Sequence, residues 1–411
     1  MQKVDFTVYN PFDAEFARNP WPVFERMLID YPVAYHTGLK AWLVAPHELA
    51  WEVTRSPRFS TNFADWSDAP PSKPESEWSL YDRVRANNLG AVSRADHLRL
   101  RKLTAPAFSR HVMDQIEDRI RDVISGVFDE ISDPREFNAA EQIAVKVPMR
   151  VIAAMVGVPP EASELFEHGL GWNTVRASNP VYAAADRDKY VRGALPGLQY
   201  VLDLVGARRA SGDFGDDFIG TLLSAADGDD RLTDLEIVAL ISALVTAGAD
   251  TAVDLHTLAL YALLTHPDQR ALLRSRPELY ESAILEILRW GAPGKLGAIP
   301  RYPLEDVEIG GQVLGQGSFV MPLMQTAWND PAKWDEPRRF DITRDHSGNI
   351  IFGAGPHLCI GLNLVKAQGR LMIEEFERRF GDTAELIGEP EYDPKHFNAR
   401  RITRLTVRTR A

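Results

Sequence analysis

The chain has 411 residues, of which 45% are hydrophobic and 25% are charged, an ordinary composition for a globular protein with a large core. Its formal charge of -12 disfavours nucleic acid and anionic membranes as partners. The only cysteine, Cys359, excludes an intramolecular disulfide and a cysteine-rich zinc site, and a lone cysteine fits a reducing compartment.

The start of the chain contains Asp5, Asp13 and Glu15 and has no long apolar stretch, so it predicts neither a signal peptide nor an anchor. The longest mainly apolar run covers residues 237–249. It is shorter than the about 20 residues that a membrane span needs. We therefore expect no transmembrane segment, no membrane partner and a cytoplasmic location.

Most of the chain shows helical periodicity. Residues 20–30 open with prolines and carry apolar residues at helical spacing, which predicts a helix. Residues 33–44 indicate a short hairpin around Thr37 and Gly38. Helical periodicity then dominates residues 97–137 and continues, with breaks, over residues 161–211.

Strand signals return only late. Residues 307–317 predict a hairpin with a Gly-Gly turn, and residues 318–323 and 402–407 predict further strands. Two stretches rich in turn-forming residues, 69–77 and 225–231, predict loops rather than linkers between domains. The sequence therefore predicts one domain over residues 1–411, mainly α with small segregated β-sheets.

A long helix is predicted between these regions. Thr233 and Glu236 have the spacing of a capping box, and an unbroken helical pattern runs from there to His266, where Pro267 ends it. Such a helix is long enough to cross a whole domain.

The middle of this helix is unusual. Residues 247–251 place Gly248, Asp250 and Thr251 where the helix should be most buried, although glycine costs about 1 kcal/mol against alanine in a helix interior and a buried carboxylate needs partners. One interpretation is a kink with an ion-paired Asp250. The other is a local opening, in which small residues admit a planar cofactor and Asp250 and Thr251 supply protons to a group bound there.

The segment around the cysteine, residues 352–361, is the most informative. Its glycines and proline predict a tight irregular loop, and Cys359 lies just before a helical pattern over residues 362–380. A helix N-terminus stabilises a thiolate, Gly361 allows a backbone N–H to approach the sulfur, and Phe352 can shield it from water. The alternative is an inert buried cysteine beside a glycine turn.

This loop matches the pattern F-x-x-G-x-x-x-C-x-G through Phe352, Gly355, Cys359 and Gly361. The pattern resembles the haem-binding loop of cytochromes P450, and the absence of C-x-x-C-H argues against covalently attached haem. The resemblance implies a cytochrome P450 fold with the long helix over the haem. It also implies haem b with iron ligated axially by Cys359, and contacts to the haem from Phe352, Gly353 and Gly361.

Other elements resemble the same family in the same order along the chain. Glu286 and Arg289 match its E-x-x-R, which implies a buried structural ion network. The resemblance gives contacts to the haem propionates to four basic residues, which suit carboxylates because charge-assisted hydrogen bonds are strong: His97, Arg101, Arg301 and His357.

The middle of the long helix resembles the family's oxygen-binding groove. The match implies that Ala247 and Gly248 lie against the cofactor and that Asp250 and Thr251 are the catalytic acid–alcohol pair. Ala252 departs from the pattern, since many relatives have a second threonine there, but Thr251 is present. Substrate contacts are implied for a further set, below a roof formed by residues 69–90: Ala243, Thr246, Ala247, Leu296, Gly297 and Phe397.

The function that this resemblance implies is a haem-thiolate monooxygenase. It would insert one atom of dioxygen into an apolar small molecule, by hydroxylation or oxidative dealkylation, with electrons from a ferredoxin and its reductase and indirectly from NAD(P)H. Cations expected to face an acidic ferredoxin are Arg94, Arg99, Lys102 and Arg110. Two alternatives remain: the same fold catalysing oxidative coupling, ring closure or peroxide-driven oxidation, and a non-enzymatic haem sensor or binding protein.

Overall fold

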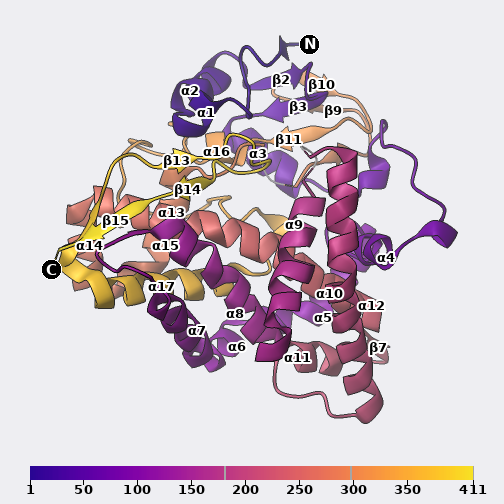
Figure 1. Ribbon diagram of the computed structural model, residues 1–411. Coiled ribbons are helices and arrows are strands. Elements are labelled where there is room, and N and C mark those ends of the chain that lie inside the picture. The colour runs from indigo at the N-terminus through magenta and orange to yellow at the C-terminus, as the bar shows by residue number, and fades with distance from the viewer. Residues whose placement is uncertain (180–181, 297–298, 411) are drawn as a thin grey trace.

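The computed structural model describes residues 1–179, 182–296 and 299–410. Helices form most of the molecule, and the strands make small separate sheets (Figure 1). The sheet that contains the N-terminal strands lies at the top of the view, away from the long helices. The predicted fold class, mainly α with segregated sheets, is confirmed.

The α-helices, in chain order, are α1 (Ala14–Arg18), α2 (Trp21–Ile29), α3 (His47–Arg55), α4 (Leu80–Ala86), α5 (Arg94–Thr104), α6 (Arg110–Gln115), α7 (Glu117–Asp129), α8 (Lys146–Val156), α9 (Asn173–Ala177), α10 (Ala184–Ser211), α11 (Phe218–Ser224), α12 (Asp234–Ala243), α13 (Asp250–Thr265), α14 (Pro267–Ser275), α15 (Tyr280–Gly291), α16 (Met324–Ala327) and α17 (Leu362–Phe380). Three π-helical segments interrupt or extend them, namely η4 (Ala140–Ala144), η6 (Leu165–Trp172) and η7 (Leu244–Ala249).

The strands are short and are β1 (Lys3–Val4), β2 (Val33–His36), β3 (Ala41–Val44), β4 (Phe59–Ser60), β5 (Glu136–Asn138), β6 (Ala226–Asp227), β7 (Asp230–Arg231), β8 (Tyr302–Pro303), β9 (Val307–Ile309), β10 (Gln312–Leu314), β11 (Val320–Pro322), β12 (Ala384–Leu386), β13 (Glu391–Tyr392), β14 (Ile402–Arg404) and β15 (Thr406–Thr409). The largest sheet has the order β1-β2-β3-β11, with β2 and β3 antiparallel and β11 parallel to β3 in the register Val320 to Trp42.

The two predicted hairpins are confirmed: β2 and β3 pair as expected, and so do β9 and β10. Three details of the prediction are wrong. The end of the segment predicted as helical forms β5, because its residues pair with β15 near the C-terminus. Residues 225–231 form a two-stranded turn, β6 and β7, rather than a plain loop. The last predicted strand is divided at Leu405 into β14 and β15, which belong to different sheets.

The helical core surrounds a central helix built from α12, η7 and α13. Helices α8, α15 and α17 pack against it, and most of its side chains are fully buried. The helix Asp234–Thr265 is long and apolar enough to cross a membrane by length and composition, and an 18-residue stretch of it has a mean hydropathy of 1.6. However, 61% of that stretch is buried inside the protein, as expected for the core helix of a globular domain.

Candidate functional site

The central helix begins and breaks where the sequence indicates. The Thr233 hydroxyl accepts from the Glu236 amide at 3.2 Å, and the Glu236 carboxylate accepts from the Thr233 amide at 2.8 Å, so the capping box is complete. Ten residues later the helix widens into the π-segment η7. π-turns inside α-helices are rare, and those that occur often lie at functional sites.

Residues around this π-segment face in different directions. A Cβ atom on Gly248 would lie 3.3 Å from Ile152 of α8, so this glycine lets the helix lie close to α8. Ala247 and Thr251, one turn apart, are exposed although the helix runs through the core. They therefore share an open face of the central helix. The Thr251 hydroxyl donates to the Ala247 carbonyl at 2.6 Å.

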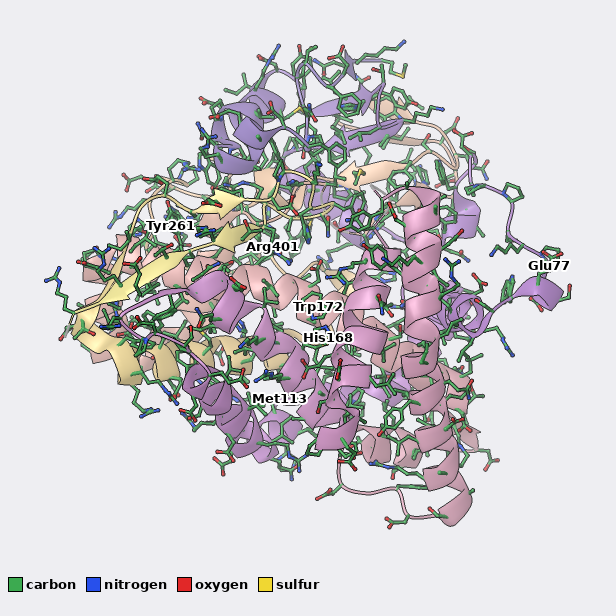
Figure 2. The ribbon with its side chains drawn as sticks, in the orientation of Figure 1. Glu77, Met113, His168, Trp172, Tyr261 and Arg401 are labelled. Carbon is green, nitrogen blue, oxygen red and sulfur yellow. The ribbon has the colours of Figure 1, made fainter. Side chains whose placement is uncertain are left out.

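Asp250 has two basic partners from the C-terminal part of the chain. Arg401 donates to its carboxylate at 2.9 Å and also pairs with Asp254 at 2.6 Å, and His396 Nε2 lies 3.4 Å from Asp250 Oδ1. Burial raises the pKa of Asp250, but the charge of Arg401 and the contact with His396 outweigh it and lower the pKa to about 2. Arg401 directly precedes β14 and lies beside the central helix (Figure 2). Asp250 is therefore ion-paired, as one of the two interpretations expects, and the helix also has an open face at Thr251.

The cysteine loop is held by its own backbone. The Cys359 amide donates to the Phe352 carbonyl at 2.9 Å, and Gly353 and Gly355 take left-handed conformations with φ of 76° and 65°, which favour glycine. Cys359 lies two residues before Gly361, the N-cap of α17. Burial raises the pKa of the Cys359 thiol, against the Gly361 amide and the Arg101 charge, which lower it. A bound metal cation deprotonates such a thiol.

Four basic side chains converge near this loop. Arg301 is 3% exposed and donates only to main-chain carbonyls, at 2.7 Å to Ile299; burial lowers its pKa to about 10. The His97 and His357 rings lie 4.1 Å apart, and burial lowers their pKa values to about 4 and about 3. Arg101 donates to the Leu358 carbonyl at 2.7 Å.

This cluster has an excess of positive charge. In the described part of the chain, none of the four side chains has a carboxylate partner. Buried cationic groups without an anion are costly, and a ligand with two carboxylates supplies the missing charge. The donor set therefore fits the propionates of haem, and the adjacent thiol of Cys359 fits its iron.

Glu286 and Arg289 form a fully buried ion pair at 2.7 Å. Arg344 approaches Glu286 to 3.3 Å, and the remaining donors of Arg289 reach the carbonyls of Trp328, Pro337 and Arg339. The pair thus ties α15 to the segment that precedes the cysteine loop.

The residues expected to contact substrate come from three parts of the chain. Ala243 and Thr246 are half-buried on the central helix, and Leu296, 4% exposed, packs in the same apolar cluster as Phe397. Gly297 lies outside the described residues. Leu296 and Phe397 therefore lie together. Gly248, which is expected to lie against the cofactor, faces α8.

Two residues of this site were missed by the sequence argument, His396 and Arg401. Their signal was a run of basic residues just before the last strands of an acidic chain, but sequence spacing alone does not connect it to Asp250. Three of the cations expected to meet a ferredoxin are ion-paired within the protein: Arg99 with Asp230 and Glu236, Lys102 with Asp227, and Arg110, at 3.7 Å, with Glu281.

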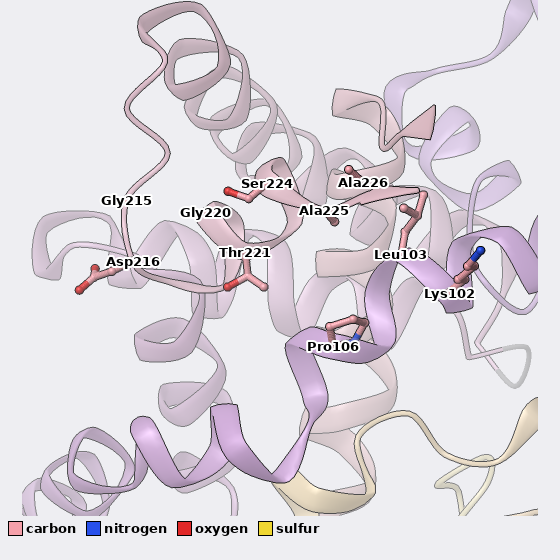
Figure 3. Close-up of a pocket in the computed structure, with 10 residues that line it drawn as sticks. All are labelled: Lys102, Leu103, Pro106, Gly215, Asp216, Gly220, Thr221, Ser224, Ala225 and Ala226. Carbon is pink, nitrogen blue, oxygen red and sulfur yellow. The ribbon is translucent and has the colours of Figure 1, made fainter. Parts of the chain in front are cut away.

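An open cavity of about 390 Å³ lies elsewhere, between the end of α5 and the region of α11 (Figure 3). Lys102, Pro106 and Thr221 are among the residues that line it. Apart from Lys102, an expected docking cation, the described residues of its lining include no predicted site residue.

Comparison with known proteins agrees with this geometry. The family model for cytochrome P450 matches residues 273–384. The chain is 34% identical to the vitamin D(3) 25-hydroxylase of Pseudonocardia autotrophica over 91% of this chain and 89% of that protein. It is 30% identical to the cytochrome P450 monooxygenase PikC of Streptomyces venezuelae over 90% and 86%. The solved structure of epothilone D-bound cytochrome P450epoK superposes with a TM-score of 0.88 at 27% identity, covering 98% of this chain and 99% of that one.

Proposed function

The chain belongs to the cytochrome P450 family, and from this premise we propose that it inserts one atom of dioxygen into a bulky apolar organic substrate. Members of the family are monooxygenases, and the chain is accordingly an enzyme that carries haem b with a cysteine thiolate on the iron. Cys359 is its only cysteine. The proposal adds the roles of the other residues, the substrate class and the redox partner.

Haem with a thiolate ligand would supply the chemistry that activates dioxygen and favours cleavage of the O–O bond. Arg101, Arg301, His97 and His357 would hold the cofactor: the charges of the two arginines would balance the two propionates, and the two neutral imidazoles would add hydrogen bonds.

Thr251 and Asp250 control the protons. The Thr251 hydroxyl lies on the open face of the helix, and by rotating away from the Ala247 carbonyl it can donate to a ligand there. Asp250 directly precedes Thr251, and a carboxyl group is suited to receive and pass a proton. Forming water from one oxygen atom of dioxygen consumes two protons, which is why such a pair favours oxygen insertion over a sensor or a binding protein.

The observation that carries this proposal is the exposure of Thr251 in the middle of a buried helix, beside an ionised acid. Thr251→Ala should keep haem and substrate binding but divert reducing equivalents into peroxide, so the product formed per NAD(P)H should fall. Thr265→Ala is the matched control, because Thr265 makes the same bond to its own helix, at 2.7 Å, at the far end of α13. Equal product yield in Thr251→Ala and Thr265→Ala would refute the role of Thr251.

The substrate class is supported by the small side chains of Ala243 and Ala247 beside Thr246, and by the relatives. These include a vitamin D(3) hydroxylase, an epothilone C/D epoxidase and a 6-deoxyerythronolide B hydroxylase. Optical titration of the ferric enzyme with vitamin D3 and with 6-deoxyerythronolide B should produce a shift from low to high spin with at least one of them. Product mass then distinguishes insertion, with one oxygen gained, from coupling or ring closure, with two hydrogens lost.

A ferredoxin and its reductase are the proposed source of electrons, in the cytoplasm. Leu358, next to the cysteine, is 40% exposed. Arg110 follows Phe108, whose carbonyl is bound by Asn363 in the first turn of α17, and its side chain is 79% exposed. Arg110 pairs with the exposed Glu281 at 3.7 Å, and such an exposed, long ion pair contributes little, so this cation near the cysteine loop can still meet an acidic ferredoxin.

Arg110→Glu should therefore slow reduction by a ferredoxin, and the effect should weaken as salt is added. Arg135→Glu, whose side chain is 80% exposed and paired with Asp133, is the control on a different part of the surface. Reversing Arg99 is a poorer test, because it breaks two short ion pairs of a less exposed side chain, with Asp230 and Glu236, whereas Arg110 loses only the exposed contact with Glu281. Equal reduction rates for both variants would exclude Arg110 from the docking surface.

A further inference from the structure

The loop between β13 and β14 is fixed on the side facing the substrate residues. Lys295, fully buried next to Leu296, donates its ammonium hydrogens to the carbonyls of Pro394 at 2.9 Å and His396 at 3.0 Å. The Lys295 amide also donates to the Asn398 carbonyl at 2.9 Å. The loop that carries His396 therefore has a defined position relative to the central helix.

The ring of His396 has a defined tautomer. Its Nδ1 accepts from the amide of Ala399 at 3.1 Å, so in the neutral ring the hydrogen is on Nε2. Nε2 in turn lies 3.4 Å from Asp250 Oδ1, as a long hydrogen bond with the imidazole as donor. The imidazole thus connects a loop amide on one side to the carboxylate of Asp250 on the other.

The two basic partners of Asp250 differ in what they can do. Arg401 stays charged at all accessible pH values and gives up no proton. Histidine is the side chain that changes charge between pH 5 and 8. In the described part of the chain, His396 is therefore the only hydrogen-bond partner of the Asp250 carboxylate that can exchange a proton near neutral pH.

Asp254 makes such an exchange possible. It holds Arg401 at 2.6 Å, so the guanidinium keeps one carboxylate when Asp250 becomes neutral. Without a second acid, protonating Asp250 would leave a buried cation unpaired. Two carboxylates that share one guanidinium allow one of them to cycle between its charged and neutral forms.

We propose that His396 is the positioning residue that delivers protons to Asp250. A proton taken up at Nδ1 breaks the bond from the Ala399 amide, and the proton on Nε2 passes to Asp250 Oδ1, which becomes a neutral acid. His396 is left with its hydrogen on Nδ1 and returns to the starting tautomer by exchange with solvent, to which its side chain is 17% exposed. This proposal rests on the proposed role of Asp250 as the acid.

Several charged groups surround the ring. From α13 it contacts the carboxylate of Asp250 and faces that of Asp254; from its own segment Arg401 shares Asp250 with it, and the ammonium of Lys295 binds its main-chain carbonyl. The nearest of these charges is the Asp250 carboxylate, so replacing it by the neutral amide of asparagine should weaken the hydrogen bond that Nε2 donates.

The first test is a nitrogen-15 spectrum of the histidine rings in the haem-loaded ferrous protein with carbon monoxide bound. His396→Gln identifies the resonance by its loss. We expect that resonance to show hydrogen on Nε2, and its chemical shift to change in Asp250→Asn, where the acceptor of that hydrogen is no longer charged. The opposite tautomer, or an unchanged chemical shift, would overturn the proposal without any measurement of turnover.

The second test follows oxygen reduction by the haem-loaded enzyme with a ferredoxin, its reductase and NADPH between pH 5.5 and 8.5. Glutamine at position 396 keeps an N–H donor for Asp250 but cannot carry a proton. His396→Gln should therefore slow oxygen reduction by on the order of 100-fold and flatten its pH profile. If Asp250→Asn is slow and His396→Gln has the wild-type rate and profile, only the role of His396 fails. If Asp250→Asn is unaffected, the role of Asp250 fails and this proposal fails with it.

Discussion

Replacing Arg289 by methionine removes the buried cation of the Glu286 pair and keeps most of the side-chain volume. Glu286 is then left with Arg344 at 3.3 Å and the Asp341 amide at 3.0 Å. Three main-chain carbonyls lose a donor, and of these the Arg339 carbonyl keeps the hydrogen bond from Arg344. Removing one partner of a buried pair costs about 3–5 kcal/mol. Because Arg344 still compensates part of the charge, we expect a loss near the lower end, about 3 kcal/mol.

The assay is urea unfolding of the haem-loaded protein at fixed haem excess, since bound haem stabilises the folded state. The chain offers a matched control at the same i,i+3 spacing, the pair Glu336 and Arg339, whose side chains are 64% and 60% exposed. Exposed pairs contribute little, so Arg339→Met should leave the midpoint unchanged. Equal midpoints for Arg289→Met and Arg339→Met would refute the reasoning that burial decides the effect.

Three further predictions concern the haem contacts, the helix packing and the acid. Arg301→Gln should speed transfer of haem to an apoglobin by about 10-fold or more, since a hydrogen bond to a charged group contributes about 1.5–3 kcal/mol; an unchanged rate would exclude this contact. Gly197→Ala should destabilise the fold by about 1–3 kcal/mol, because its Cβ would lie 2.6 Å from the Leu170 amide, whereas Gly126→Ala, with open space around it, should stabilise α7 by about 0.5–1 kcal/mol; thermal unfolding compares the two. The carboxylate of Asp250, with its pKa lowered from 3.8 to about 2, stabilises the fold above about pH 4, and this contribution is lost as the pH falls towards 2. The difference in unfolding free energy between wild type and Asp250→Asn should therefore shrink over that range, and a constant difference would contradict it.

The sequence predicts the local features of this fold well. The Thr233 capping box, the Gly-Gly turn of β9 and β10 and the glycines of the cysteine loop depend on neighbouring residues, and each lies where its pattern indicates. The strand β5 was missed because its residues are held by β15, more than 260 positions away in the chain. Pairing between segments so far apart in the chain leaves no periodic pattern in the local sequence of either one.

The site divides in the same way. Cys359 and its loop form one continuous segment with a specific pattern, so the sequence identifies them directly. The partners of Asp250 do not form one segment with it, since Arg401 reaches Asp250 only after the chain has passed through α14 to α17 and six strands, β8 to β13. Two of the expected docking cations show the same limit of the sequence: Asp227 and Asp230, on a short turn far along the chain, pair with Lys102 and Arg99.

The π-segment η7 also determines the register of the second half of the central helix. The central helix is held at its start by α4 and α10, which pack against α12, and at its end by α15 and α17, which pack against α13, so it cannot turn as a whole and the extra residue that a π-turn accommodates is absorbed locally. An α-helical path through the same residues would turn every later side chain by about 100°, the step between consecutive helical residues. The direction in which Thr251 faces thus depends on the π-segment: a single-residue deletion in η7 should convert it to regular α-helix and leave Thr251 facing as it does now, whereas a regular helix through all the present residues would turn it away.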